Sequence, residues 1–359
     1  MEKWNPNIIH GMKINPTFYR KTDQAVWTGR NDGTDPAVQR WHQRIVAVDL
    51  FTEELPVLRS GQKGIALIGF SCDEGVRRNG GRTGAKEGPV NFRKTCGSLP
   101  VHFEQDTLFV DLGDIICPGN EMEQAQNELA VLVEMALKNE YLPFIIGGGH
   151  EVAYGHYTGI NAFLKNSKKN DHFASGGRSN NTNLSGSIGI INFDAHFDLR
   201  ERNENGYNSG TGFLQIARDC ATAKQEFRYL PIGIQENSNT KQLFDSAEAL
   251  NVHYISAEQF LPAAQSALTE KILKFIEESS VIYLTICMDV FSSSVAPGVS
   301  AAAYNGIFPD PFFFNCLHTI LTSGKVISAD IAEYNPTYDS EQRTAKLAAA
   351  LAFKMINRA

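Results

Sequence analysis

The sequence lacks the features that mark secreted, membrane-spanning and nucleic-acid-binding proteins. Its N-terminus, MEKWNPNIIHGMKINP, has no apolar core of signal-peptide length. No apolar run approaches the ~20 residues that a helix needs to cross a bilayer. A basic excess is also absent, because 33 Lys and Arg stand against 40 Asp and Glu, for a formal net charge of -7. These absences argue against nucleic-acid and membrane partners and favour a cytoplasmic protein.

Cysteine is present but too scattered for a disulfide framework or a CxxC metal motif. The six cysteines stand at positions 72, 96, 117, 220, 287 and 316. In a chain of 359 residues, such a distribution is typical of reduced thiols that serve mostly as small core residues. The composition, 42% hydrophobic and 20% charged, is that of a globular protein with one large α/β domain or two ordinary ones.

Short apolar runs alternate with segments of helical periodicity. The runs lack strict polar alternation, as expected for strands that are covered on both faces. Between most of them lie segments with apolar residues at helical spacing, for example 121–140, 256–279 and 339–356. This order predicts a parallel sheet with helices on both sides. The eight runs are 65–70, 107–113, 142–148, 187–193, 227–234, 252–256, 281–287 and 325–331.

Two regions depart from this alternation. Residues 1–60 carry Pro, Trp and charges without clear strands, so we expect an N-terminal extension that wraps a main domain over 61–359. Residues 166–186 are polar and rich in Gly, Ser and Asn, which predicts a mobile surface loop. Its histidine, His172, is therefore a poor candidate for a functional site.

Ligands of an open parallel sheet bind beyond the carboxyl ends of its strands. Four of the runs end in stretches that contain histidine or acidic residues. The most specific of these is NFDAHFDLR (192–200). Asp194, His196 and Asp198 alternate there, so an extended backbone points all three the same way. Two carboxylates and an imidazole on one face call for a cation, and an oxygen-rich set with one imidazole suits manganese or magnesium.

The other three run ends with histidine or acidic residues are GGGHE (147–151), CMDVF (287–291) and DIAEYNP (330–336). Taken alone, His150 and Asp289 are compatible with ordinary turns, and Glu333 with a surface glutamate. Together with the DAHFD stretch, two histidines and three aspartates suffice for two divalent ions that share Asp194. Paired ions commonly drive hydrolysis, so the residues predict a metal-dependent hydrolase without indicating its substrate.

In this order, GGGHE, DAHFD, TICMD and EYNP resemble the motifs of the arginase/agmatinase/formimidoylglutamase family, the ureohydrolases, from about residue 65 to the C-terminus. Gly149 stands where arginases and agmatinases usually have Asp, and this points to the formimidoylglutamase branch. The stretches DEGVRRNGGRTGAKEGP (73–89), VAPGVSA (295–301) and WTGRND (27–32) are similar to that branch as well.

The resemblance implies a three-layer α/β/α fold around an eight-stranded, mainly parallel sheet, in a homo-oligomer. It implies hydrolysis of N-formimidoyl-L-glutamate to glutamate and formamide, a late step of histidine degradation. Two alternatives stay open, namely an agmatinase-like or other guanidine hydrolase and a metal-poor, inactive homologue.

Carried over by motif, the family's ligands imply up to two manganese ions. One would be held by His150, Asp194 and Asp198, and the second by His196, Asp194 and Asp289. Cys287 falls where the family has an aspartate that bridges both ions. A thiolate there restores the charge, but sulfur is a soft ligand and manganese prefers oxygen, so we expect weaker metal loading.

The resemblance also implies roles in catalysis and substrate binding. Glu333 would pair with the amidinium nitrogens, and Asp198 would pass a proton toward the leaving nitrogen. Arg78, or its neighbours Arg77 and Arg82, would bind a substrate carboxylate, unless these arginines tie the glycine-rich loop to its surroundings. Further polar contacts to the substrate are expected from Asn208, Ser209 and Thr211. The loop 205–213 has no histidine to act as a proton shuttle, and His156 suits packing or support of the site.

Overall fold

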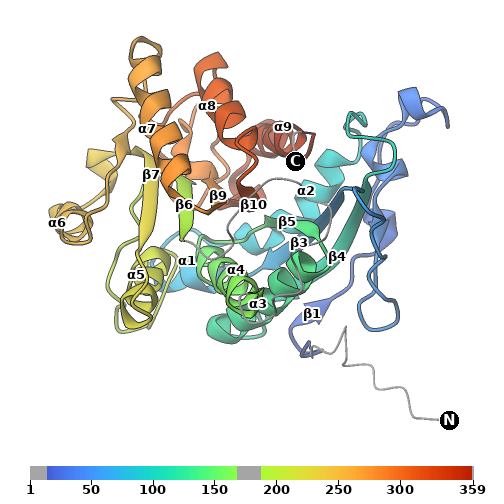
Figure 1. The fold of residues 1–359 in the computed structure, drawn as a ribbon, viewed down its shortest axis with the longest axis horizontal. Coiled ribbons are helices and arrows are strands. Elements are labelled where there is room, and N and C mark those ends of the chain that lie inside the picture. The colour runs from blue at the N-terminus through green and yellow to red at the C-terminus, as the bar shows by residue number, and fades with distance from the viewer. Residues whose placement is uncertain (1–13, 168–186, 358–359) are drawn as a thin grey trace.

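A ten-stranded sheet forms the centre of the computed structural model, which describes residues 14–167 and 187–357 (Figure 1). The strand order is β1-β4-β3-β5-β10-β9-β6-β7-β8, and β2 also pairs with β4. Every pair is parallel except β1 with β4. The strands are β1 (Tyr19–Arg20), β2 (Val46–Ala47), β3 (Gly64–Ser71), β4 (Leu108–Ile116), β5 (Tyr141–Ile146), β6 (Ile188–Phe193), β7 (Arg228–Ile234), β8 (Ile255–Ser256), β9 (Val281–Cys287) and β10 (Val326–Ala332).

The eight predicted runs correspond to β3 through β10, and the mainly parallel sheet is confirmed. The expected number of eight strands is too low, because the N-terminal segment adds β1 and β2 beside β4. Each of these has two residues, which is too short to produce a recognisable periodicity. The predicted loop 166–186 lies outside the described residues, except for 166 and 167, which end α4.

Helices form most of the connections between the strands. One of them, α7, begins later in the sequence than predicted. The segment 256–279 is helical only from Gln265, because Pro262 opens a separate short turn and disfavours a helical residue before it. No helix within 14–167 and 187–357 has the length and apolarity to cross a bilayer. The helices are α1 (Glu74–Arg78), α2 (Gly88–Cys96), α3 (Met122–Lys138), α4 (Val152–Ser167), α5 (Gly212–Thr222), α6 (Lys241–Ala249), α7 (Gln265–Glu278), α8 (Pro311–Leu321) and α9 (Arg343–Ile356).

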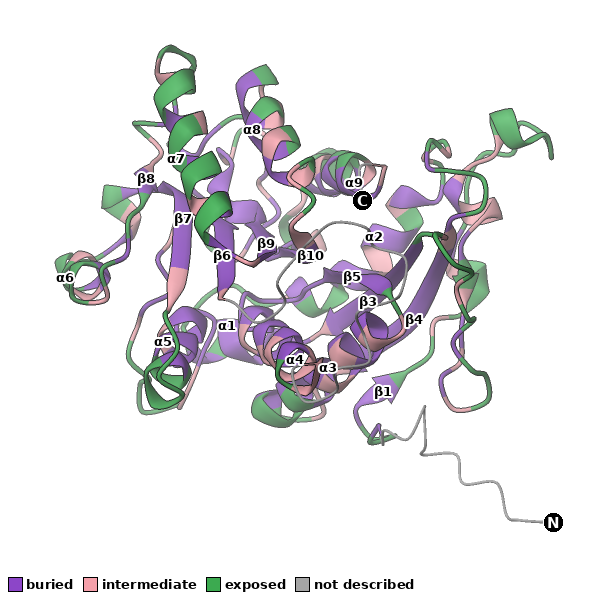
Figure 2. Ribbon diagram, viewed as in Figure 1, coloured by how far each residue is buried: buried purple, intermediate pink, exposed green. Residues whose placement is uncertain are grey.

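The helices cover both faces of the sheet, so the fold has three layers (Figure 1). One buried apolar cluster contains side chains of α3, α4, α5 and α6, and the other contains side chains of α2, α7, α8 and α9. Along β9, Tyr283 belongs to the first cluster, whereas Ile282 and Leu284 belong to the second. Figure 2 shows the strands buried and the outer sides of the helices exposed. Burial on both faces explains why the runs lack polar alternation.

A buried charge cluster ties the N-terminal segment to β4. Arg93 of α2 is 2% exposed and contacts Asp111 Oδ2 at 2.7 Å and Asp114 Oδ1 at 2.6 Å. From the N-terminal segment, Trp27 Nε1 donates to Asp111 at 2.8 Å, and Arg20 contacts Asp114 at 3.0 Å. The described part of the N-terminal segment and helix α2 therefore bind the same two carboxylates of β4, Asp111 and Asp114.

Replacing Arg93 with methionine is expected to lower the free energy of unfolding by about 3–5 kcal/mol, because it leaves the buried Asp111 without a cation and Asp114 with only the exposed Arg20. Urea denaturation measures this change. Arg20→Met is the matched control: its side chain is 57% exposed, and the expected loss is below about 1 kcal/mol. Equal losses in the two variants would contradict a structural role for the buried cluster.

Candidate metal centre

Four neighbouring strands at the centre of the sheet bring together the strand ends that carry the candidate site residues. The strands lie in the order β5-β10-β9-β6, all parallel, so their carboxyl ends meet at one edge. His150 follows β5 and Glu333 follows β10, while Cys287 ends β9 and Asp194 follows β6. The register places Ala332, the residue before Glu333, opposite Cys287. The sheet thus gathers the predicted ligands from three separate stretches of sequence, and Glu333 from a fourth.

Asp194 lies between the two histidines. Its Oδ2 is 2.8 Å from His150 Nδ1, and its Oδ1 is 3.5 Å from His196 Nδ1. Asp198 Oδ2 lies 3.0 Å from His150 Nδ1, and Asp289 Oδ2 lies 3.2 Å from His196 Nδ1. These contacts place the five side chains in two half-sites, one around each imidazole, that share Asp194.

Cys287 stands between the half-sites. Ligand atoms of Cys287, His150 and Asp194 lie within 4.8 Å of one another, as do those of Asp194, His196 and Asp289. The thiol is 1% exposed and donates a hydrogen bond to Asp289 Oδ1 at 2.8 Å. The thiol therefore lies near His150 and Asp194 of the first half-site and contacts Asp289 of the second. This is the position at which the resemblance implies a bridging group.

The carboxyl groups of the cluster repel one another. Burial raises the pKa of Asp198 and of Asp289, and the neighbouring Asp194 raises both further. Burial and Asp289 raise the pKa of Glu333 to about 7. Burial, followed by Asp194, raises the pKa of the Cys287 thiol well above its usual range. Each shift disfavours a further negative charge, and a divalent cation would relieve this repulsion.

The same carboxylates favour the positively charged form of the two imidazoles, His150 and His196. Burial by itself lowers the pKa of His150, but Asp194 and Asp198 outweigh it and hold that pKa well above its usual value. His150 Nδ1 is nevertheless a buried atom without a hydrogen-bond partner, although two carboxylate oxygens lie within 3.0 Å of it. Such convergence without hydrogen-bond geometry fits ligands around a shared cation, and the mostly oxygen donor set suits manganese or magnesium.

The two predicted catalytic carboxylates have left-handed backbones. Asp198 has φ 49° and Glu333 has φ 66°, a region that non-glycine residues rarely occupy and that is enriched at functional sites. Glu333 is held firmly, since its Oε1 accepts from the backbone N–H of His150 at 2.8 Å and its Oε2 accepts from the Ser300 hydroxyl. This hydrogen bond therefore links the carboxyl end of β10 to the GGGHE turn after β5.

Gly149 leaves room for the carboxyl group of Glu151, a residue that the sequence reasoning did not single out. A Cβ at position 149 would lie 2.0 Å from Glu151 Oε2. Glu151 Oε1 accepts from the Gly75 backbone at 2.8 Å, and burial, with Glu333, raises its pKa to about 8. The available signal was Gly149 itself, because any side chain at position 149 would collide with the carboxyl group of Glu151.

The arginines of the glycine-rich loop are engaged by the protein. Arg78 contacts the carboxylates of Glu74 and Glu123 and donates to the backbone carbonyls of Asn120 and Tyr207. All of its donor nitrogens are thus used. Arg77 contacts Glu74, and Arg82 donates to the carbonyls of Val299 and Ser300. The structure favours the alternative in which these arginines tie the loop to its neighbours rather than bind substrate.

The other predicted substrate contacts are also largely used within the loop before α5. Asn208 Oδ1 accepts from the Gly210 backbone, and Thr211 Oγ1 accepts from the Asn208 backbone, both at 3.0 Å. Ser209 Oγ accepts from Asn79 at 3.2 Å. These contacts shape the loop and connect it to the end of α1.

Arg200, the last residue of the NFDAHFDLR stretch, was not among the predicted contacts. Its side chain is half-buried and runs over Gly210, where a Cβ would lie 2.8 Å from Arg200 Cδ. Among the residues the structure describes, no hydrogen bond or ion pair engages its guanidinium. The sequence signal is its place two residues after Asp198, on the ligand-bearing edge.

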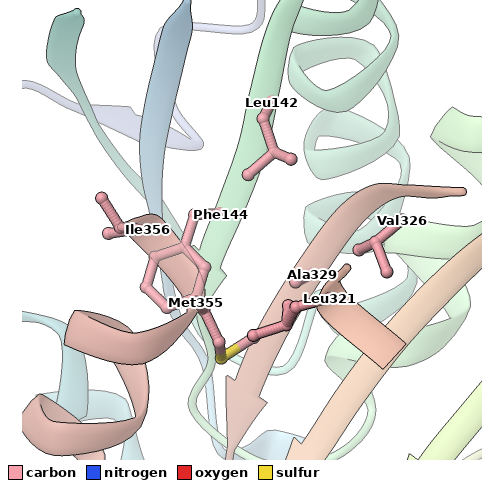
Figure 3. A pocket seen from close by; sticks show the side chains of 7 residues that line it. All are labelled: Leu142, Phe144, Leu321, Val326, Ala329, Met355 and Ile356. Carbon is pink, nitrogen blue, oxygen red and sulfur yellow. The ribbon is translucent and has the colours of Figure 1, made fainter. Parts of the chain in front are cut away.

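A hollow in the apolar core is distinct from this site (Figure 3). Figure 3 shows seven apolar side chains around it, and none of them carries a polar group that would recognise a ligand. Leu142 is near the start of β5 and Val326 starts β10, so the hollow lies toward the amino ends of these strands. It is a packing gap between the sheet, α8 and α9, lined by Leu142, Phe144, Leu321, Val326, Ala329, Met355 and Ile356.

The sequence profile of the arginase family matches residues 63–357, and the chain belongs to this family. Its curated relatives include the formimidoylglutamase of Clostridium tetani, which is 38% identical over 342 residues (94% of this chain and 96% of the relative). The formimidoylglutamase of Aeromonas hydrophila is 38% identical over 348 residues (96% and 99%).

Solved structures share the fold. Formimidoylglutamase from Bacillus subtilis superposes with a TM-score of 0.71 at 21% identity, over 92% of this chain and 95% of that one. Trypanosoma cruzi formiminoglutamase with Mn2+2 superposes with a TM-score of 0.67 at 23% identity, over 84% of this chain and 94% of that one. The predicted arginase-like α/β fold is thereby confirmed.

Proposed function

We infer that this protein is a formimidoylglutamase, which hydrolyses the linear amidine N-formimidoyl-L-glutamate to L-glutamate and formamide. Curated formimidoylglutamases align with it at 38% identity along nearly its whole length. The observation that carries the chemistry is Asp194, whose two oxygens face two different imidazoles at the centre of the sheet edge. That arrangement serves metal-dependent hydrolysis, the reaction type of the enzyme family to which the chain belongs.

We propose that manganese is the cofactor, with up to two ions. His150, Asp194 and Asp198 would hold one, and His196, Asp194 and Asp289 the other, with Cys287 between them. Ions bound there would lower the pKa of a water molecule and so supply hydroxide, at neutral pH, as the nucleophile for the amidine carbon. The sulfur of Cys287 makes this site less suited to manganese than an all-carboxylate bridge.

The remaining site carboxylates would orient the substrate. Glu333 accepts hydrogen bonds from the His150 backbone and Ser300, and this fixed position supports the proposal that its carboxylate would pair with the amidinium group. Asp198 borders His150 and would deliver a proton to the leaving nitrogen, which departs as the amine of glutamate. Both roles use side chains whose backbone conformations the surrounding structure holds in place.

Arg200 is our candidate for binding a carboxylate of the glutamate part. The substrate carries carboxylates away from the amidine, and a guanidinium binds such groups through paired hydrogen bonds. Arg78 has no donor left for this task, whereas Arg200 has no acceptor within 14–167 and 187–357. An agmatinase would instead need acidic groups for a cationic tail.

Comparing substrates tests the function and this residue together. The wild type is expected to release formamide from N-formimidoyl-L-glutamate with a much higher kcat/KM than it hydrolyses agmatine. Arg200→Gln should raise the KM for formimidoylglutamate by about 10–100-fold, because charge-assisted hydrogen bonds are worth about 1.5–3 kcal/mol.

Arg202→Gln is the matched control, since Arg202 is exposed, and it should leave the KM within about twofold. A preference for agmatine would overturn the proposed function. An unchanged KM in Arg200→Gln would overturn only the role of Arg200.

We also propose that the protein works in the cytoplasm as a homo-oligomer. All six cysteines are free, which is typical of a reducing compartment. The oligomer rests on the resemblance to the family.

A further inference from the structure

A chain of buried hydrogen bonds leads from His150 into the sheet, away from the other proposed ligands. His150 Nε2 lies 3.1 Å from Thr285 Oγ1, and the Thr285 hydroxyl donates to Asp330 Oδ1 at 2.6 Å. The three side chains are at most 2% exposed. Thr285 on β9 and Asp330 on β10 are paired residues in the register, so the link crosses two adjacent strands directly behind the site.

Asp330 is anchored on its other side as well. Its Oδ2 accepts from the Tyr283 hydroxyl at 2.5 Å and lies 2.6 Å from His156 Nδ1. The His156 and Tyr283 rings also contact each other, with centroids 4.3 Å apart. Both oxygens of Asp330 are therefore engaged, and the carboxylate has no freedom to turn away from Thr285.

The direction of the hydrogen bonds determines which nitrogen of His150 carries the hydrogen when the ring is neutral, as a metal-ligating imidazole is. A threonine hydroxyl has one hydrogen, and Thr285 directs it to Asp330. Toward His150 it offers only a lone pair, so His150 Nε2 must carry the hydrogen and donate. In a neutral imidazole this leaves Nδ1 as the lone-pair nitrogen, and Nδ1 is the atom that faces Asp194 and Asp198.

We propose that Asp330, acting through Thr285, is a positioning residue that fixes the ring and tautomer of His150 so that Nδ1 faces a divalent cation. The inference rests on the proposed ligand set. Partners that fix a ligating histidine through its second nitrogen are a general feature of metal sites, and their loss costs about 10–100-fold in metal affinity. His156, which the sequence suggested for packing or support, would act one step further back.

The second histidine provides an internal comparison. In the described part of the chain, the side chain of His196 contacts Asp194 and Asp289, in both cases through Nδ1. Its side chain is 22% exposed, and within 14–167 and 187–357 no hydroxyl hydrogen-bonds to its Nε2. Removing the Thr285 hydroxyl should therefore weaken the half-site of His150 and spare that of His196.

The test is a Mn²⁺ titration of purified protein, followed by electron paramagnetic resonance of the free ion. Thr285→Val keeps the shape of the side chain but removes the hydroxyl, and we expect one Mn²⁺ to bind about 10–100-fold more weakly. Thr285→Ser, which keeps the hydroxyl, should bind like the wild type. Tyr283→Phe removes a different hydrogen bond to the same carboxylate, which His156 Nδ1 and Thr285 still hold, and should stay within about twofold. Thr285→Ala replaces Thr285→Val if the latter does not fold.

A second readout separates positioning from packing. Nitrogen NMR of labelled histidine, in protein loaded with diamagnetic Mg²⁺, should show His150 protonated at Nε2 in the wild type and in Thr285→Ser, and a changed signal in Thr285→Val. Wild-type affinity and tautomer in Thr285→Val would overturn the inference, and so would equal losses in Thr285→Ser or Tyr283→Phe. A wild type that binds no Mn²⁺ would overturn the proposed ligand set and the inference with it.

Discussion

Asp194→Asn is expected to lower kcat/KM for formimidoylglutamate by more than about 100-fold, which exceeds the usual effect of changing a residue outside the ligand sphere. Asp194 is the side chain whose two oxygens face both imidazoles, so its loss affects both half-sites. An amide is neutral and offers one oxygen instead of two. Formamide release at saturating manganese and the metal content after dialysis measure the effect.

Asp245→Asn is the control for this substitution, because Asp245 is exposed on α6 and far in sequence from the ligand motifs. It should retain the activity and metal content of the wild type. If Asp194→Asn kept its manganese and its activity, Asp194 would not be the shared ligand.

Cys287→Asp is expected to tighten manganese binding by about tenfold, or about 1.4 kcal/mol. The change replaces a soft sulfur with hard oxygens at the position between the two half-sites. Without metal, the added charge lies against Asp289, which already accepts from the thiol at 2.8 Å, so the thermal unfolding temperature should fall. With manganese it should rise above that of the wild type, since ligands that bind the folded state stabilise it.

Cys287→Ser separates the two properties of the substitution, because it removes the sulfur without adding a carboxylate. It should not bind manganese more tightly than the wild type. Unchanged affinity in Cys287→Asp would place position 287 outside the ligand set. Manganese binding and activity gained only in Cys287→Asp would instead support the alternative of a metal-poor homologue.

The strand-end residues could be predicted because parallel strands follow one rule. His150, Asp194 and Asp289 each follow an apolar run, and strands that run parallel deliver such residues to one edge. Local sequence marked each of them as a candidate, but His150 and Asp289 became predicted ligands only when they were considered together with the DAHFD stretch. The order β5-β10-β9-β6, which makes these particular ends neighbours, is a property of the whole fold.

Residues whose roles depend on distant partners could not be predicted in this way. Arg78 looked like a substrate ligand, but its partners include Glu123 and the carbonyl of Tyr207, 45 and 129 positions away in the sequence. Thr285 and Asp330 likewise gain a role only because β9 and β10 pair in one register. Tertiary contacts decide whether a polar side chain is free to bind a ligand.

Anomalous diffraction from crystals soaked in manganese tests the central claim most directly. We expect two anomalous peaks, one among His150, Asp194 and Asp198 and one among His196, Asp194 and Asp289, with Cys287 beside both. The first peak should disappear in Thr285→Val at a manganese concentration that still fills both positions in the wild type. Crystals of the wild type with no peak at this edge, or with manganese bound only elsewhere, would contradict it.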